Sequence, residues 1–145
     1  MTIFTDEDFI PESKSSNHQL AVSCFPAMSN FNGRKYPLSW IRTLQSSSHL
    51  VLLDAASYVS TNPLDLSSVK PDFVVISFYK MFGYPTGLGA LLVKNSSSGV
   101  LERRDYFGGG TVDLALVRKN EAFRRSNISQ KFEDGTIDFL GKYLI

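Results

Sequence analysis

The chain has 145 residues, of which 43% are hydrophobic and 20% are charged, and its formal net charge is +1. This composition is typical of one soluble globular domain and excludes a disordered or collagen-like chain. The balanced charge gives no electrostatic reason to expect nucleic acid as a partner, because such binding requires clustered Lys and Arg. Cys24 is the only cysteine, which excludes an internal disulfide and a cysteine-rich metal site, so we expect no metal.

The start of the chain favours a protein of the cytoplasm. Residues 1–8 are acidic and lack the basic start and apolar core of a signal peptide. No apolar run approaches the roughly 20 residues that a membrane helix needs, so we expect no membrane partner. The lone cysteine also fits a reducing compartment. Residues 1–19 form a polar segment, which we expect to precede a domain that comprises residues 20–145.

The first half of this domain predicts an α/β fold. We expect a strand at residues 20–25, a turn at 29–33, a helix at 37–44, and strands at 50–54 and 73–76. The last two strands are unbroken apolar runs, which are typical of a parallel sheet that is covered on both faces. One ends on Asp54 and the other leads to Ser77, so both place polar side chains at the same edge of the sheet.

The second half carries a lysine in an unusual place. Lys80 follows the strand at 73–76 and lies beside a turn that contains several glycines. Lysine is rarely buried, and functional residues concentrate on loops at strand ends, so Lys80 predicts chemistry rather than solubility. The expected elements beyond it are a strand at 90–93, a loop at 94–99, a short helix at 100–104, an irregular glycine-rich segment at 106–112, a solvated helix or loop at 118–125, a turn at 132–136 and a helix from 137 onward.

Asp54 and Lys80 together have the chemistry that pyridoxal 5'-phosphate requires. This cofactor needs a lysine that holds its aldehyde as an imine and a carboxylate that keeps its ring nitrogen protonated. Ser77, Tyr79 and Thr111 are candidate donors to its phosphate. Taken alone, Asp54 is better explained as a strand-end or helix-capping aspartate, and Lys80 as a solvated turn lysine. The spacing of strand, carboxylate, strand and lysine is what favours the cofactor.

Five segments of the chain look like the aminotransferase-like domain of eukaryotic molybdenum cofactor sulfurases. They comprise residues 29–38, 51–57, 77–93, 106–111 and 132–136. The likeness begins near Leu20, runs to the end of the chain and keeps the order and spacing of the motifs. It implies an α/β fold that is part of the large domain of a fold-type I, class V transferase, with a mostly parallel sheet flanked by helices. It also implies relatedness to cysteine desulfurases.

The resemblance further implies an enzyme, its substrates and its assembly. The implied activity is that of a pyridoxal phosphate-dependent sulfurtransferase, which takes sulfur from L-cysteine through an enzyme persulfide. The implied acceptor is the molybdenum cofactor of xanthine dehydrogenase and aldehyde oxidase. A homodimer is implied for the full enzyme.

The resemblance assigns roles to four residues around the cofactor ring. Lys80 would form the covalent link to the cofactor, and Asp54 would pair with the ring nitrogen. Asn30 and Ser57 match positions that contact the 3-oxygen side of the ring.

Three hydroxyl residues match phosphate contacts, namely Ser77, Tyr79 and, across a dimer interface, Thr111.

The family's persulfide cysteine and the arginine that binds the substrate carboxylate have no match in the chain, and we expect Cys24 to be a buried, inert core residue. The chain is therefore expected to be the central part of a larger enzyme. Two alternatives stay open: a non-catalytic remnant or interaction module of this fold, and another class V enzyme such as a cysteine desulfurase.

Overall fold

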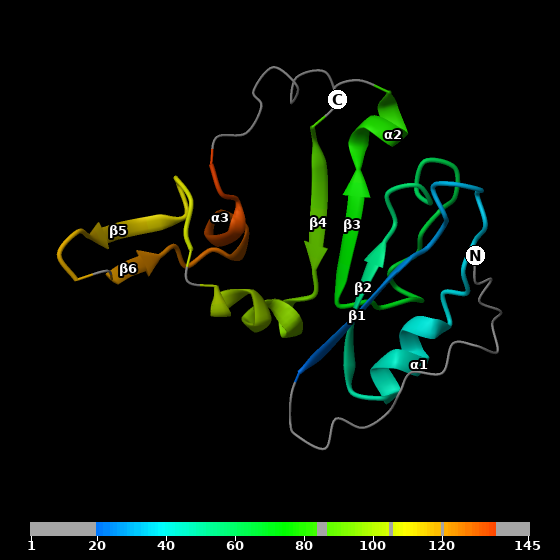
Figure 1. Ribbon diagram of the computed structural model, residues 1–145, viewed down its shortest axis with the longest axis horizontal. Coiled ribbons are helices and arrows are strands. Elements are labelled where there is room, and N and C mark those ends of the chain that lie inside the picture. The colour runs from blue at the N-terminus through cyan, green and yellow to red at the C-terminus, as the bar shows by residue number, and fades with distance from the viewer. Residues whose placement is uncertain (1–19, 84–86, 105, 120, 136–145) are drawn as a thin grey trace.

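A computed structural model describes residues 20–83, 87–104, 106–119 and 121–135 (Figure 1). The predicted polar segment at 1–19 and the predicted helix from 137 onward lie outside these described residues. Within them, no helix is long and apolar enough to cross a membrane.

The described residues build a four-stranded sheet in the order β1-β2-β3-β4. Its strands are β1 (Ala21–Pro26), β2 (His49–Asp54), β3 (Phe73–Ser77) and β4 (Gly89–Val93). The β1–β2 and β2–β3 pairs are parallel, and β4 runs antiparallel to β3. The prediction of a mostly parallel sheet is confirmed. The arrows of β2 and β3 point toward the same edge of the sheet, where Figure 1 shows α2 (Phe78–Phe82).

One face of the sheet is covered by α1 (Trp40–Ser46), which directs Ile41 and Leu44 into the core. They meet Phe25, Val51 and Leu53 from β1 and β2. The helix begins at Trp40 rather than at Pro37, because residues 37–39 form a turn that leads into it. The apolar spacing that predicted the helix is therefore the spacing that forms the core.

Cys24 does not belong to this core. It alternates along β1 with Phe25, which faces α1, so the Cys24 side chain lies on the opposite face of the strand, where it is exposed. The prediction of a buried cysteine was wrong because the apolar neighbours of Cys24 indicate a strand but do not indicate which of its faces is covered.

The second half of the chain leaves the sheet after β4 and forms smaller elements beside it. These are the 3₁₀ helix η1 (Asn95–Arg103), the strands β5 (Val112–Leu116) and β6 (Glu121–Arg124), and α3 (Ile128–Phe132). β5 and β6 pair as an antiparallel hairpin, which Figure 1 shows projecting away from the sheet beside α3. Two predictions are corrected here: residues 94–99 are mostly the start of η1 rather than a loop, and residues 118–125 contain β6 rather than a helix or loop.

A buried carboxylate, Asp72, ties the first half of the fold to η1. Its side chain accepts hydrogen bonds from the backbone N–H of Val51 at 2.9 Å, from Gln45 Nε2 at 3.0 Å and from the hydroxyl of Ser97 at 2.7 Å. Burial acts to raise the pKa of Asp72, but these hydrogen bonds and the charge of Lys94 outweigh it and lower the pKa below its ordinary value. Asp72 is therefore held as an anion in the interior.

Candidate functional site

Three turns at the carboxyl edge of the parallel strands carry the candidate site. The first follows β1 and contains Asn30. Ser29 shapes this turn, because its hydroxyl accepts hydrogen bonds from the backbone N–H groups of Phe31 and Asn32. Gly33 closes it with a φ of 72°, a conformation that glycine adopts at little cost. Asn30 is thereby held on a tight turn rather than on a free loop.

The second turn follows β2, whose last residue is Asp54, and contains Ser57. The backbone carbonyl of Asp54 accepts from Ala27 N–H at 2.8 Å, so the strand end is fixed to the chain beyond β1. The Asp54 carboxylate accepts from Ala56 N–H at 2.9 Å. Ser57 belongs to the helical turn that starts at Ala55. The strand end thus fixes the carboxylate, and the turn after it fixes the hydroxyl.

The third turn is α2, which follows β3 without a loop and contains Lys80. The helix ends at Gly83, whose N–H donates to the carbonyl of Tyr79 and whose φ is 85°. Lys80 was expected on a turn, and this turn is one turn of α-helix. The helix directs the lysine stem back toward the ends of β1 and β2.

The Lys80 amine reaches both of the other turns. Its Nζ donates to Asn30 Oδ1 at 3.0 Å and to Ser57 Oγ at 3.1 Å, and the Ser57 hydroxyl donates to Asn30 Oδ1 at 2.9 Å. Three side chains that are distant in the sequence are therefore joined by hydrogen bonds. Asn30, Ser57 and Lys80 were all predicted as site residues, and the structure brings them together.

A cavity of about 560 Å³ opens beside this group, and Asn30, Asp54, Ser57 and Lys80 all line it. Its volume is within the range of small-molecule sites. The cavity offers an amine, a carboxylate, an amide and a hydroxyl, which are the groups that a pyridine aldehyde with a phenolic oxygen requires. Pyridoxal phosphate therefore fits the residues that are present.

Ser77 and Tyr79 both precede Lys80 in the chain but belong to different elements, β3 and α2. Tyr79 is exposed and lines a neighbouring cavity together with Lys80, and its ring centroid lies 5.8 Å from Lys80 Nζ. Ser77 is the last residue of β3 and precedes the first turn of α2. Their predicted contacts with a phosphate stay predictions.

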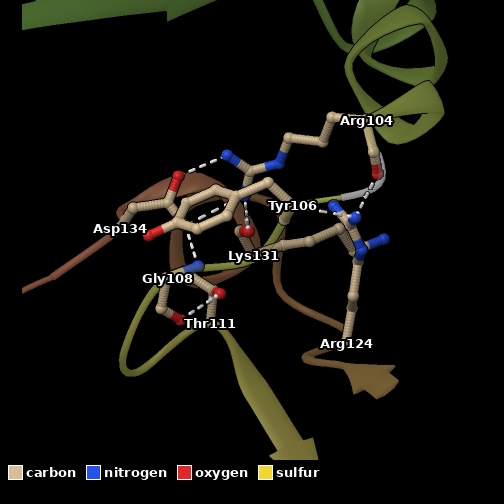
Figure 2. Close-up of polar contacts among 7 residues, drawn as sticks. All are labelled: Arg104, Tyr106, Gly108, Thr111, Arg124, Lys131 and Asp134. Atoms are coloured by element: carbon tan, nitrogen blue, oxygen red, sulfur yellow. Dashed lines mark hydrogen bonds and ion pairs between the residues drawn. The ribbon is translucent and has the colours of Figure 1, made fainter. Parts of the chain in front are cut away.

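Thr111 lies away from this cavity, between β5 and the glycines that precede it. Its exposed fraction is 0%, and its hydroxyl donates to the carbonyl of Gly108 at 2.7 Å. Figure 2 shows Thr111 and Gly108 beside a cluster in which Asp134 pairs with Arg104. The structure therefore does not bring Thr111 to Lys80 within the described chain, and its contact across a dimer interface stays a prediction.

Asp134 shapes the glycine segment next to Thr111. Its carboxylate binds the Arg104 guanidinium and accepts from Gly108 N–H at 2.7 Å (Figure 2). The hydrogen bond from Arg104 and that from Gly108 are the main causes that lower the pKa of Asp134. On the other side of Arg104, the carbonyl oxygens of Arg104 and Tyr106 accept from Arg124. The cluster fixes the backbone of the segment through charged side chains.

We expect Gly108→Ala to destabilise this segment. A Cβ at residue 108 would lie 2.6 Å from Asp134 Cβ and 2.8 Å from its Oδ1, so Asp134 would have to move away from Arg104. Overpacking of this kind costs about 1–3 kcal/mol. Gly109→Ala is the matched control, because a Cβ there meets nothing within 4 Å. Thermal unfolding of both variants tests this, and equal melting temperatures would contradict it.

The sequence reasoning missed several residues that line the cavity with Lys80. Met28, Phe31 and Tyr36 all lie on or beside the turn after β1. The signal was available, since this turn follows a strand that is parallel to β2 and so ends at the same edge of the sheet. The likeness at residues 29–38 was used only for Asn30.

Comparisons with known proteins show the family of the chain. A family model described as aminotransferase class-V matches residues 9–145, and so begins within the segment that was predicted to precede the domain. The molybdenum cofactor sulfurase of Homo sapiens is 55% identical over an alignment of 126 residues, and the match covers 81% of this chain and 14% of that protein. The molybdenum cofactor sulfurase of Bombyx mori is 49% identical over an alignment of 143 residues, and the match covers 88% of this chain and 17% of that protein.

A solved structure shows the same fold. The cysteine desulfurase CsdA from Escherichia coli is similar with a TM-score of 0.69 and 27% sequence identity, over 83% of this chain and 29% of that chain. The predicted fold, part of a class V transferase domain, is thereby confirmed. The chain spans less than a fifth of the length of the two curated relatives. Because the family model matches nearly the whole of it, the chain belongs to the class V aminotransferase family.

Proposed function

We propose that this chain provides part of the pyridoxal phosphate site of a molybdenum cofactor sulfurase-type enzyme. The observation that carries the proposal is the convergence of Lys80, Asp54, Asn30 and Ser57 on one cavity at the carboxyl edge of the sheet. The implied reaction takes sulfur from L-cysteine and delivers it to the molybdenum cofactor. The names of the two relatives reported above support the molybdenum cofactor as the sulfur acceptor over a plain cysteine desulfurase.

Each residue of the site has a physical task in this proposal. Lys80 would hold the cofactor covalently, and its amine, once released, would move a proton at Nζ. Asp54 would hold a proton on the ring nitrogen, and Asn30 and Ser57 would bind the oxygen beside the aldehyde. When bound, the cofactor supplies an electron sink for the substrate amino acid.

The sulfur-accepting thiol is not assigned to Cys24, which lies on β1 and is not among the residues that line the cavity with Lys80. Thr111 is proposed to reach the cofactor phosphate of a partner subunit in a homodimer, and Ser77 and Tyr79 to bind the phosphate within the chain. A cytoplasmic location is proposed from the lone cysteine, which fits a reducing compartment.

Addition of pyridoxal phosphate to the purified chain tests the site. We expect a visible absorption band and, after borohydride reduction, a single modified lysine that mass spectrometry places at Lys80. Lys80→Ala should abolish both, whereas Lys70→Ala, an exposed lysine at another place in the fold, should change neither. Asp54→Asn should weaken binding about tenfold or more, because a hydrogen bond to a charged group contributes about 1.5–3 kcal/mol. Modification spread evenly over the lysines of the wild-type chain would refute the proposal.

A further inference from the structure

The hydrogen bonds around Lys80 form a closed triangle with Asn30 and Ser57, which consists only of side chains of this chain. Each corner comes from a different turn: the turn after β1, the turn after β2 and the helix α2. Ser57 and Lys80 are both half-buried. The amine is therefore not a freely rotating surface group but is held at the wall of the cavity.

The direction of the hydrogen bonds shows what Ser57 contributes. A serine hydroxyl has one hydrogen, and Ser57 donates it to Asn30 Oδ1. Toward Lys80, Ser57 is therefore an acceptor only. The carbonyl oxygen of Asn30 has two lone pairs and accepts from both Ser57 and Lys80. Both partners of the amine are thus neutral oxygen acceptors, which hold it without forming an ion pair.

We propose that Ser57 is a positioning residue that, together with Asn30, holds the Lys80 amine in place before the cofactor is bound. A lysine stem loses much rotamer freedom when its amine is fixed. A stem that the triangle already orders does not lose that freedom again when the amine reacts. The purpose of holding the lysine, its reaction with the cofactor, rests on the proposed function. The triangle itself does not.

This role differs from a contact with the cofactor ring, which is what the family resemblance implies for Ser57. A ring contact acts only when the cofactor is present. The triangle acts on the free chain, so it changes how the lysine reacts with a reagent that has no ring. The two roles therefore predict different results for the same variant.

Competitive labelling of the cofactor-free chain with acetic anhydride tests the triangle. Mass spectrometry would compare acetylation of Lys80 with that of Lys119, an exposed lysine in the β5–β6 turn. We expect Ser57→Ala to raise the Lys80 to Lys119 ratio about three- to tenfold, the effect of losing one hydrogen bond. Ser57→Thr, which keeps a hydroxyl, should restore the wild-type ratio. Ser60→Ala is the matched control, because the Ser60 hydroxyl donates to the backbone carbonyl of Ser57 and is not a member of the triangle.

Asn30→Ala provides a second variant on an exposed turn and should raise the ratio as Ser57→Ala does. An unchanged ratio in both variants, with circular dichroism showing a folded chain, would overturn the triangle. If Ser57→Ala weakens pyridoxal phosphate binding but leaves acetylation unchanged, Ser57 contacts the ring only, and the proposal is wrong. If the wild-type chain binds no pyridoxal phosphate, the proposed function fails, and the acetylation ratios still decide the proposal about Ser57.

Discussion

Replacement of Asp72 by alanine is expected to destabilise the fold by about 2–4 kcal/mol. The substitution leaves buried donors on Val51 and Ser97 without their acceptor, and each such group costs about 1–3 kcal/mol. Asp72 is only 4% exposed, so water cannot replace its carboxylate without a change in the packing. Urea denaturation at pH 7 measures the loss. Asp65→Ala is the matched control, because Asp65 is an exposed aspartate whose carboxylate accepts from the backbone N–H and the hydroxyl of Ser67, two residues along the chain.

The same site predicts a pH dependence with a definite sign. The pKa of Asp72 is lower in the folded chain than in the unfolded one. Its contribution to the free energy of unfolding is therefore fully present above about pH 4, where an ordinary aspartate titrates. It is lost as the pH falls through the lower folded value. The stability difference between the wild type and Asp72→Ala should therefore shrink between pH 5 and pH 2. A difference that stays constant over this range would show that Asp72 does not act through its charge.

Replacement of Leu53 by alanine is expected to cost about 3–5 kcal/mol of unfolding free energy. Leu53 has an exposed fraction of 0% and packs in the core with Phe25, Val51 and the α1 residues. Loss of a fully buried leucine side chain removes transfer free energy and leaves a cavity. Leu91→Ala is the matched control within the same sheet, because Leu91 is 50% exposed and should lose about 1 kcal/mol or less. Chemical denaturation of both variants compares them, and similar losses would mean that Leu53 is not a core residue.

Apolar runs allowed the centre of the sheet to be predicted. β2 and β3 contain the continuous apolar runs 50–53 and 73–76, and such runs are typical of the central strands of a parallel sheet. Once the two strands are parallel, Asp54 and Lys80 must follow strand ends at one edge. The proximity of the two residues therefore follows from simple topology.

The elements that were missed depend on contacts that the sequence does not display. β6 carries charged residues at Glu121 and Arg124, so its alternation was hidden, and its pairing with β5 is what makes it a strand. Asp72 lies in a stretch that looks like a polar turn, and its burial follows only from the arrival of Gln45 and Ser97. Long-range packing decided both outcomes.

The candidate site was also predicted only in part. The family likeness identified Asn30 and Ser57, but it assigned them to a cofactor ring and gave no reason to expect a contact with Lys80. That contact depends on the length of α2, which ends before Gly83, and on the shape of the turn after β1, which Ser29 and Gly33 set. Such local geometry is visible only once the backbone is placed.

The topology of the sheet has a consequence for the order in which the site forms. β3 and β4 pair across the short stretch that contains α2, whereas the parallel β1–β2 and β2–β3 pairs join segments that are further apart in the sequence. Contacts that close short loops form at a lower entropic cost, so we expect the β3–α2–β4 unit to fold first. Lys80 would then exist in its helix before Asn30 and Ser57 arrive. Mutations that slow the docking of β1 should delay assembly of the site without touching any residue of the cavity.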